Sequence, residues 1–285
     1  MYAVTGATGQ LGRLVVAELL KTVPAGQIVA VVRDPAKAAD LAGQGVAVRQ
    51  ADYSQPGTLA GALAGADKVL LISGNEVGHR VPQHKAVIDA AKAAGAKLVG
   101  YTSVLRADGS KLGVAEEHRQ TEQVLKSSGV PWVLLRNGWY TENYLGNVAP
   151  ALQYGAISGA SGEGRISAAT RADYAAGTAA VLTSSESQAG RTYELAGDEA
   201  FTMAQFAAEL SRQSGKPVAF HNLSEADYKA QLLGFGLPEP IAQMLARSDA
   251  AAAGGDLYDD SRQLSGLIGR PTTPLKAVLA AALAG

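Results

Sequence analysis

The stretch TGATGQLG at residues 5–12 lies between an apolar run and a helical pattern. The residues before it, Tyr2-Ala3-Val4, have the composition of a short strand. After it, apolar residues recur at helical spacing as far as Leu20. A glycine-rich turn between a strand and a helix is typical of a dinucleotide site. The Gly-x-x-Gly-x-x-Gly spacing differs from the commonest dehydrogenase form, so a sharp structural turn is the alternative.

The three glycines have separate expected roles. One makes the tight turn, one lets the backbone approach a pyrophosphate, and one lets the helix pack close to the sheet. The helix N-terminus then offers N–H groups and a positive dipole end to the phosphates. We therefore expect the cofactor along the whole turn, which comprises Gly6, Ala7, Thr8, Gly9, Gln10, Leu11 and Gly12.

The composition narrows the class of protein. The chain has 285 residues, 47% of them apolar, which is enough for one large or two modest domains. The 25 Lys and Arg and 26 Asp and Glu form no long run, so we expect neither a nucleic-acid partner nor membrane insertion. There is no cysteine, which excludes disulfides and thiolate catalysis. With a strand starting at Tyr2 and no long apolar run, we expect no signal peptide and a cytoplasmic location.

Short β-rich runs alternate with helical patterns through the first half of the chain. The expected strands are 2–4, 28–32, 46–49, 68–72, 97–102 and 132–135, and the clearest helices between them are 81–94 and 114–127. This order predicts an α/β fold with a doubly wound parallel (Rossmann) sheet. Its ligand should lie beyond the carboxyl ends of the strands.

The amino-acid composition and the pattern of expected elements change after Arg136. A Gly-, Ser-, Tyr- and Asn-rich segment at 138–170 precedes a helix at 171–182, a strand at 192–195 and a mostly helical remainder. We expect a dinucleotide-binding domain of residues 1–137 plus 171–197. A second, smaller and mostly helical substrate lobe should comprise 138–170 plus 198–285, with its Ala-rich tail docked as a helix.

The second expected strand ends in Arg33-Asp34, about 20 residues beyond the glycine turn. An acidic side chain at this place holds the ribose hydroxyls of NAD, whereas an arginine suits the 2′-phosphate of NADP. Adjacent residues of an extended segment point to opposite sides, so only one of the two can face the ribose. We favour Arg33 and NADP. The alternative is that Arg33 merely ends the strand.

Polar residues follow three further strands of the expected sheet. Those after the third strand should lie near the adenine edge or cap a helix, those after the fourth should let the cofactor backbone pass, and those after the fifth should lie beneath the nicotinamide ribose. In chain order the candidates are Asp52 and Tyr53, then Ser73, Gly74 and Asn75, and then Thr102 and Ser103.

Several motifs together resemble the NmrA-like atypical short-chain dehydrogenases/reductases. They are the opening TGATGQLG, Arg33 after VAVV, the LLISG and YTS strand ends, LLRNGWYTENY at 134–144, RADYAAG at 171–177, YELAGD at 193–198, LSEADY at 223–228 and GRPTTPL at 269–275. The likeness runs nearly end to end and is greatest to the flavin-free bacterial NADPH:quinone oxidoreductases of the second type. It implies NADP binding by Gly6 to Gly12, Arg33, Ser73 to Asn75 and the loop from Asn137.

That loop directly follows the sixth expected strand. It offers amide groups at Asn137 and Asn143, and flat faces at Trp139, Tyr140 and Tyr144, for a planar ring. We expect Asn137, Gly138, Trp139 and Tyr140 to contact the cofactor, and Asn143 and Tyr140 to serve catalysis. The alternative is an aromatic hinge that packs one lobe onto the other.

The Tyr-x-x-x-Lys pair that many short-chain dehydrogenases use for proton transfer is absent, because no tyrosine has a lysine four residues later. The corresponding helix carries His118 with Glu122 four residues on. His118 is a candidate proton donor, although a structural histidine is the stronger interpretation. His79, His84 and His221 lack metal-ligand spacing, so no metal site is expected. A quinone needs a proton donor less than a simple ketone does.

Two functions from different classes remain open at this point. The favoured one is an enzyme that moves a hydride from NADPH to a small planar quinone-like substrate. The alternative is a catalytically silent NADPH-sensing regulatory protein that binds a partner, and the missing Tyr/Lys pair fits it too. Reduction of other conjugated dyes would differ from the first only in substrate. The sequence leaves homo-oligomer formation open.

Overall fold

The computed structural model describes residues 1–284 in two compact units. The first comprises Met1–Val104, Glu117–Arg136 and Tyr174–Tyr193, and the slightly shorter second comprises Leu105–Glu116, Asn137–Asp173 and the chain from Glu194 onward. Each unit consists of three separate segments of sequence, whereas the expected division gave two segments to each domain.

A seven-stranded sheet with the order β3-β2-β1-β4-β5-β6-β8 forms the centre of the first unit. The chain order reverses between β1 and β4, and β1 to β5 pair in parallel, which confirms the doubly wound α/β fold. The strands are β1 Tyr2–Thr5, β2 Ile28–Val32, β3 Ala47–Gln50, β4 Lys68–Leu71, β5 Leu98–Val104, β6 Trp132–Asn137 and β8 Arg191–Leu195.

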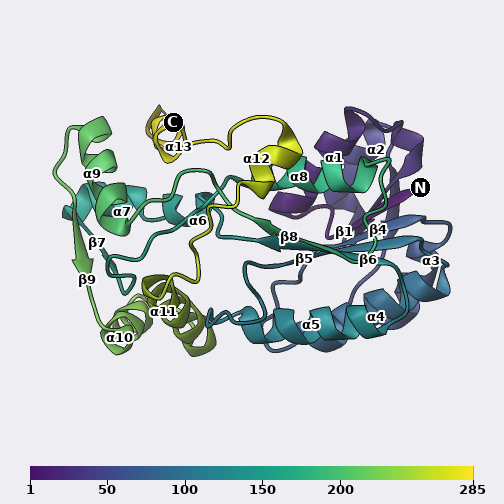
Figure 1. Cartoon of the computed structure of the whole chain (residues 1–285), viewed down its shortest axis with the longest axis horizontal. Helices are drawn as coiled ribbons and strands as arrows, with labels where there is room; N and C mark the ends of the chain where they lie inside the picture. The colour runs from purple at the N-terminus through teal and green to yellow at the C-terminus, as the bar shows by residue number, and fades with distance from the viewer. Residues whose placement is uncertain (285) are drawn as a thin grey trace. The chain divides into compact units, whose positions relative to one another are not determined.

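Helices cover both faces of this sheet. Figure 1 shows α1, α2 and α8 over one face and α3, α4 and α5 over the other. Their bounds are α1 Gln10–Leu20, α2 Ala39–Gly43, α3 Leu59–Leu63, α4 Arg80–Ala93, α5 Ala115–Ser127 and α8 Arg171–Thr183, with short 3-10 turns at Ala25–Gln27, Pro35–Ala38 and Pro56–Thr58. All five residues of β2 are buried, as a strand covered on both faces requires.

A buried apolar core lies between the sheet and α3 and α4. Leu59 and Leu63 of α3 and Ile88 of α4 meet Val69 and Leu71 of β4 there. The helix predicted at 81–94 corresponds to α4, whereas α3 was not among the helices named from the sequence. The core fixes β4, and thereby the loop that follows it at the carboxyl edge of the sheet.

The second unit is mostly helical but contains a small parallel sheet, β7 Ala156–Gly159 paired with β9 Ala219–Asn222. Its helices are α6 Glu142–Leu145, α7 Val148–Tyr154, α9 Met203–Ser214, α10 Glu225–Gly234, α11 Glu239–Ala253, α12 Gln263–Ile268 and α13 Leu275–Ala284. The two strands were not expected from the sequence. Each has only four residues, and β9 is largely exposed, so neither carries a clear alternation of apolar residues.

Candidate functional site

The glycine turn has the geometry that its three expected roles require. Gly6 has φ +62°, in the left-handed region that favours glycine. Gly12 is buried in α1, and a Cβ there would lie 2.8 Å from the Cα of Ala7, so this glycine permits close packing of helix and turn. Gly9 is exposed at the N-cap of α1, and no side chain caps the helix.

An anion fits this helix N-terminus. The first N–H groups of a helix have no partner within it, and the first turn of α1 carries no acidic side chain that would occupy or repel a phosphate. Ala7 and Leu11 are buried, and the Ala7 N–H donates to the carbonyl of Val31 at 3.3 Å. Thr8, Gly9 and Gln10 are the more exposed members of the turn.

Arg33 and Asp34 differ in what their side chains do. The Asp34 carboxylate accepts the N–H of Ala36 at 3.0 Å and caps the following 3-10 turn. Arg33 is exposed, and its guanidinium makes only a 3.5 Å contact with Glu76. Asp34 is therefore occupied locally, whereas the Arg33 guanidinium is accessible to a phosphate.

Tyr53 is partly exposed, and its hydroxyl lies beside the glycine turn. Its hydroxyl bonds with the Thr5 side chain and donates to the carbonyl of Ile72 at 3.0 Å. A Cβ on Gly6 would lie 3.8 Å from this hydroxyl. Tyr53 thus joins the ends of β1 and β4. The Asp52 carboxylate accepts the N–H of Ser54 at 2.9 Å, so it caps a tight turn.

The two candidates at the end of β5 have different environments. Thr102 Oγ1 accepts the N–H of Ser73 at 2.9 Å, which ties β5 to the loop after β4. Ser103 donates to Glu122 at 2.6 Å, and Arg136 donates to both oxygens of that buried carboxylate. The Ser103 hydroxyl therefore belongs to an internal ion-pair network.

His118 is buried against Tyr101. Its Nδ1 and the Tyr101 hydroxyl are 2.7 Å apart. Burial, and then the nearby charge of Arg80, keep the pKa of His118 well below its usual value. The ring is neutral at physiological pH, which supports the structural interpretation of this histidine.

The loop after β6 lies in the second unit, together with Asn137, the last residue of β6. Asn137 is 3% exposed, and its amide atoms make no hydrogen bond of good geometry among residues 1–284, although the Tyr140 hydroxyl is a polar neighbour of this amide. A buried amide without partners costs free energy unless a ligand or water completes it. Its donor and acceptor fit a carboxamide such as that of nicotinamide. The N–H of the next residue, Gly138, donates to the carbonyl of Leu195 at 2.7 Å.

Arg171 organises the rest of this loop. Its guanidinium lies 4.4 Å from the centre of the Tyr140 ring and donates to Asn143 Oδ1 at 2.8 Å. It also pairs with Glu142 at 3.5 Å. Trp139 and Tyr140 are partly exposed, and burial raises the pKa of the Tyr140 hydroxyl.

The expectation that Tyr144 offers a flat face to a planar ring is wrong. Tyr144 is buried, and its ring centre lies 5.7 Å from that of Phe201 and 5.9 Å from that of Phe206. It belongs to the aromatic core of the second unit. The sequence of the loop could not show that Tyr144 faces the interior while its neighbours face solvent. Tyr144 lies in α6, which has only four residues and is too short to show a helical pattern of apolar residues.

Sequence reasoning missed three groups that hold the loop between β4 and α4. His84 and Arg80 bind the backbone of Gly74, and Glu117 binds that of Gly78. The available signal was the one-turn spacing of Arg80 and His84 directly after a candidate loop.

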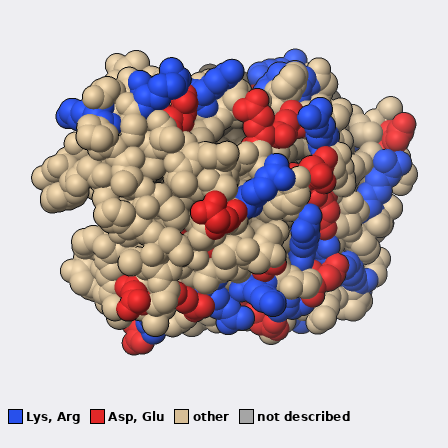
Figure 2. Space-filling view, turned by 60° about the vertical axis from the view of Figure 1, so that its left-hand side comes forward, with Lys and Arg blue, Asp and Glu red and all other residues tan. Residues whose placement is uncertain are grey.

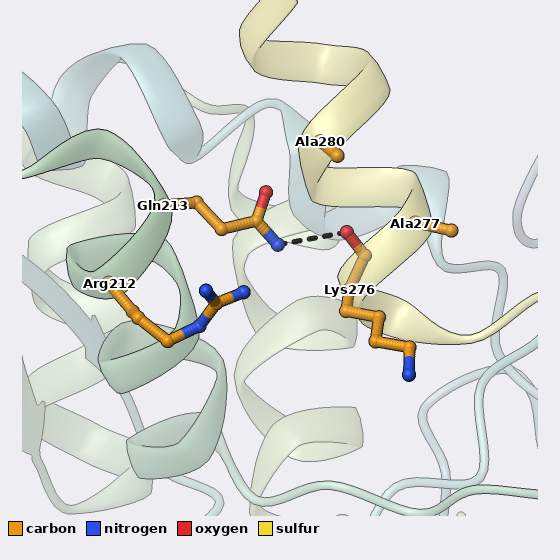
Figure 3. A pocket seen from close by; sticks show the side chains of 5 residues that line it. All are labelled: Arg212, Gln213, Lys276, Ala277 and Ala280. Carbon is orange, nitrogen blue, oxygen red and sulfur yellow. Dashed lines mark hydrogen bonds between the residues drawn. The ribbon is translucent and has the colours of Figure 1, made fainter.

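A groove of about 590 Å³ lies elsewhere in the second unit, between α9 and α13 (Figure 3). Gln213 crosses it and donates to the carbonyl of Lys276 at 2.9 Å, and Arg212 is paired with Glu209. No expected site residue lines this groove.

On the face drawn in Figure 2, Lys and Arg alternate with Asp and Glu, and neither sign forms an extended patch. None of the described helices is both long and apolar enough to cross a bilayer.

Residues 6–185 match the model of the NAD(P)H-binding family. The chain belongs to this family, which confirms the nucleotide-binding class expected from the sequence. It is 58% identical to quinone oxidoreductase 2 of Escherichia coli, over 96% of each chain. The crystal structure of the E. coli NADPH-dependent quinone oxidoreductase in complex with NADPH covers 99% of this chain and is itself covered completely, with a TM-score of 0.97 and 56% identity.

A second solved relative is the triphenylmethane reductase of Citrobacter sp. complexed with NADP(H). It is 39% identical, with a TM-score of 0.93 over 99% of this chain and 100% of its own. An NAD(P)H azoreductase of Xenophilus azovorans is 32% identical over 86% of this chain and 85% of its own.

Proposed function

We propose that this protein is an NADPH-dependent reductase that transfers a hydride to a quinone. The observation that carries the proposal is the 58% identity, over 96% of both chains, to quinone oxidoreductase 2 of E. coli. The matching fold of the NADPH complex supports the cofactor. Because NADPH is an intracellular metabolite, we propose a cytoplasmic location.

NADPH, when bound, supplies the hydride from its nicotinamide ring. The chain's own residues hold the cofactor: the N–H groups at the start of α1 would bind the pyrophosphate, and Arg33 the 2′-phosphate. The buried amide of Asn137, which has the Tyr140 hydroxyl as a polar neighbour and makes no hydrogen bond of good geometry, would bind and orient the nicotinamide carboxamide. Glycine at position 9 leaves room for the pyrophosphate to approach the backbone.

Asn143 and Tyr140 are the groups that we assign to the acceptor. Arg171 donates to the Asn143 carbonyl oxygen, which leaves the N–H donors of that amide for an oxygen of the quinone. The same guanidinium stacks on the Tyr140 ring and so restricts it. A donor placed in this way stabilises negative charge that develops on the quinone oxygen. The buried, neutral His118 is not needed for this step.

Anaerobic mixing of the protein with NADPH and a panel of quinones tests the proposal. The absorbance of reduced nicotinamide should fall with at least one quinone, and much more slowly with NADH as donor. If the protein binds NADPH tightly but oxidises it with no quinone, the proposed enzyme is wrong. The silent sensor is then the better account.

Reduction of conjugated dyes is a second candidate function. The likeness to a triphenylmethane reductase and an azoreductase favours it. The same anaerobic assay, with a triphenylmethane and an azo dye added to the panel, ranks the acceptors by kcat/KM. A dye that exceeds every quinone would change the proposed substrate and leave the cofactor chemistry unchanged.

A further inference from the structure

Both backbone polar groups of Gly74 are held by side chains of α4. The Gly74 N–H donates to His84 Nε2 at 2.9 Å, and Arg80 Nε donates to the Gly74 carbonyl at 2.8 Å. Arg80 and His84 lie one turn apart on α4, so their side chains share one face of the helix. Two side chains of one helix thus hold both backbone polar groups of a single residue, and with them the two peptide units on either side of Gly74.

The His84 ring has a fixed tautomer. Because Nε2 accepts a hydrogen bond, the neutral ring carries its proton on Nδ1, which lies 3.0 Å from Thr121 Oγ1 of α5. The Thr121 hydroxyl in turn donates to the carbonyl of Glu117 at 2.8 Å. His84 is fully buried, and burial, followed by the charge of Arg80, lowers its pKa to about 3. The ring therefore stays an acceptor for Gly74 throughout the physiological range.

The rest of the loop is tied down from the same side. The Glu117 carboxylate accepts the N–H of Gly78 at 3.0 Å and that of Arg80 at 3.1 Å. At the other end of the loop, the N–H of Ser73 donates to Thr102. The segment from Ser73 to Gly78 is thus fixed by protein groups before any ligand arrives.

We propose that His84 and Arg80 are positioning residues that set Ser73–Asn75 in the conformation that binds NADPH. The inference rests on the proposed function, because Ser73 to Asn75 bind the cofactor only if the protein uses NADPH as the sequence analysis expects. A segment already ordered in its binding conformation loses less entropy when the ligand binds, so affinity rises without a new contact. His84 and Arg80 act through Gly74 and touch no substrate.

Two substitutions of His84 separate its hydrogen bonds. In His84→Gln the amide oxygen replaces Nε2 and still reaches Gly74. In His84→Asn the shorter amide replaces Nδ1, so the bond to Thr121 survives and the bond to Gly74 is lost. The two variants are both neutral, polar and smaller than histidine, and each is the matched control of the other. Arg80→Lys keeps the charge but loses the hydrogen bond from Nε, so it tests the contribution of the bond from Arg80 to the Gly74 carbonyl.

Titration calorimetry with NADPH, on protein free of substrate, is the primary measurement. His84→Asn should bind NADPH about tenfold more weakly, as expected for the loss of one ordering hydrogen bond, whereas His84→Gln should stay within a few-fold of the unmodified protein. In the quinone assay, His84→Asn should raise the KM for NADPH and leave kcat at saturating NADPH nearly unchanged. Arg80→Lys should behave like His84→Asn.

Amide hydrogen exchange of residues 73–78 in the cofactor-free protein provides a readout that does not depend on activity. Exchange should be faster in His84→Asn than in His84→Gln. Equal NADPH affinity in the two variants, or weakened binding with unchanged exchange, would overturn the positioning role. If the unmodified protein fails to bind NADPH, the proposed function is wrong, whereas the exchange difference still tests the grip on Gly74.

Discussion

Asn143 is the residue on which the assignment of the acceptor site depends. Asn143→Asp keeps an oxygen for Arg171 but removes the N–H donors and adds a negative charge, and Asn143→Ala removes both. A preorganised donor to a developing oxyanion is worth about 10²–10³ in rate, and less where it is as exposed as Asn143. Both variants should therefore lower kcat with quinone and leave the NADPH affinity nearly unchanged. Stopped-flow rates and calorimetry measure the two quantities; normal turnover in both variants would remove Asn143 from the mechanism.

Arg33 determines the expected choice between NADPH and NADH. Arg33→Ala removes a charge-assisted bond to the 2′-phosphate, typically about 1.5–3 kcal/mol, so the preference for NADPH should shrink by about one to two decades. Asp34→Asn is the matched control, because the asparagine still caps the turn at Ala36 and the preference should hardly change. Dissociation constants for both cofactors test this. Equal affinities in the unmodified protein would contradict it.

At the scale of elements, the strands and helices of the first unit were predictable because local pattern and tertiary packing agree there. The predicted 28–32 strand is β2 as the structure has it, and the helix after the glycine turn is α1. The β7-β9 pair was not predictable, since two short strands far apart in sequence carry no local signal for their pairing.

The candidate site shows the same difference between features with a local sequence signal and features that depend on distant partners. Backbone roles at Gly6 and Gly12 could be inferred from spacing, because a tight turn and a close helix contact leave a glycine signature. The directions of single side chains could not. Asp34 turns to its own loop, Ser103 to Glu122 and Tyr144 to an aromatic core, and each depends on partners far away in the sequence.

The turn between β1 and α1 should respond differently at its second and third glycines. Gly12→Ala places a Cβ 2.8 Å from the Ala7 Cα, so the helix must shift, at a typical cost of about 1–3 kcal/mol in stability. Gly9→Val adds its side chain at an exposed position, where its Cβ lies 3.2 Å from the Gly6 carbonyl oxygen, so the turn must adjust slightly and the fold should survive while cofactor binding collapses. Thermal unfolding and NADPH calorimetry distinguish the two outcomes. Normal NADPH binding by Gly9→Val would make the turn purely structural.

At the scale of the whole molecule, two buried neutral histidines make stability depend on pH. The pKa of His84 is lowered to about 3 and that of His118 well below its usual value, both mainly by burial. As the pH falls below about 6.5, the unfolded chain takes up these protons and the folded protein does not. The free energy of unfolding therefore falls with falling pH, from about 6.5 toward the folded pKa values.

Between pH 7 and pH 5 His84 should cost about 2 kcal/mol of stability, since its pKa is about 6.5 in the unfolded chain and about 3 in the folded protein, and His118 should add a loss in the same direction. The exposed carboxylates Asp67 and Glu209, whose pKa values are lowered to about 2, mainly by Lys97 and Arg212, act only at lower pH. Urea unfolding at both pH values measures the change. His118→Phe and His84→Gln should each reduce the change, because each removes one of the two protons that the unfolded chain takes up. If neither substitution reduces the loss of unfolding free energy between pH 7 and pH 5, these two rings take up protons in the folded protein as they do in the unfolded chain. His118 would then again be a candidate proton donor.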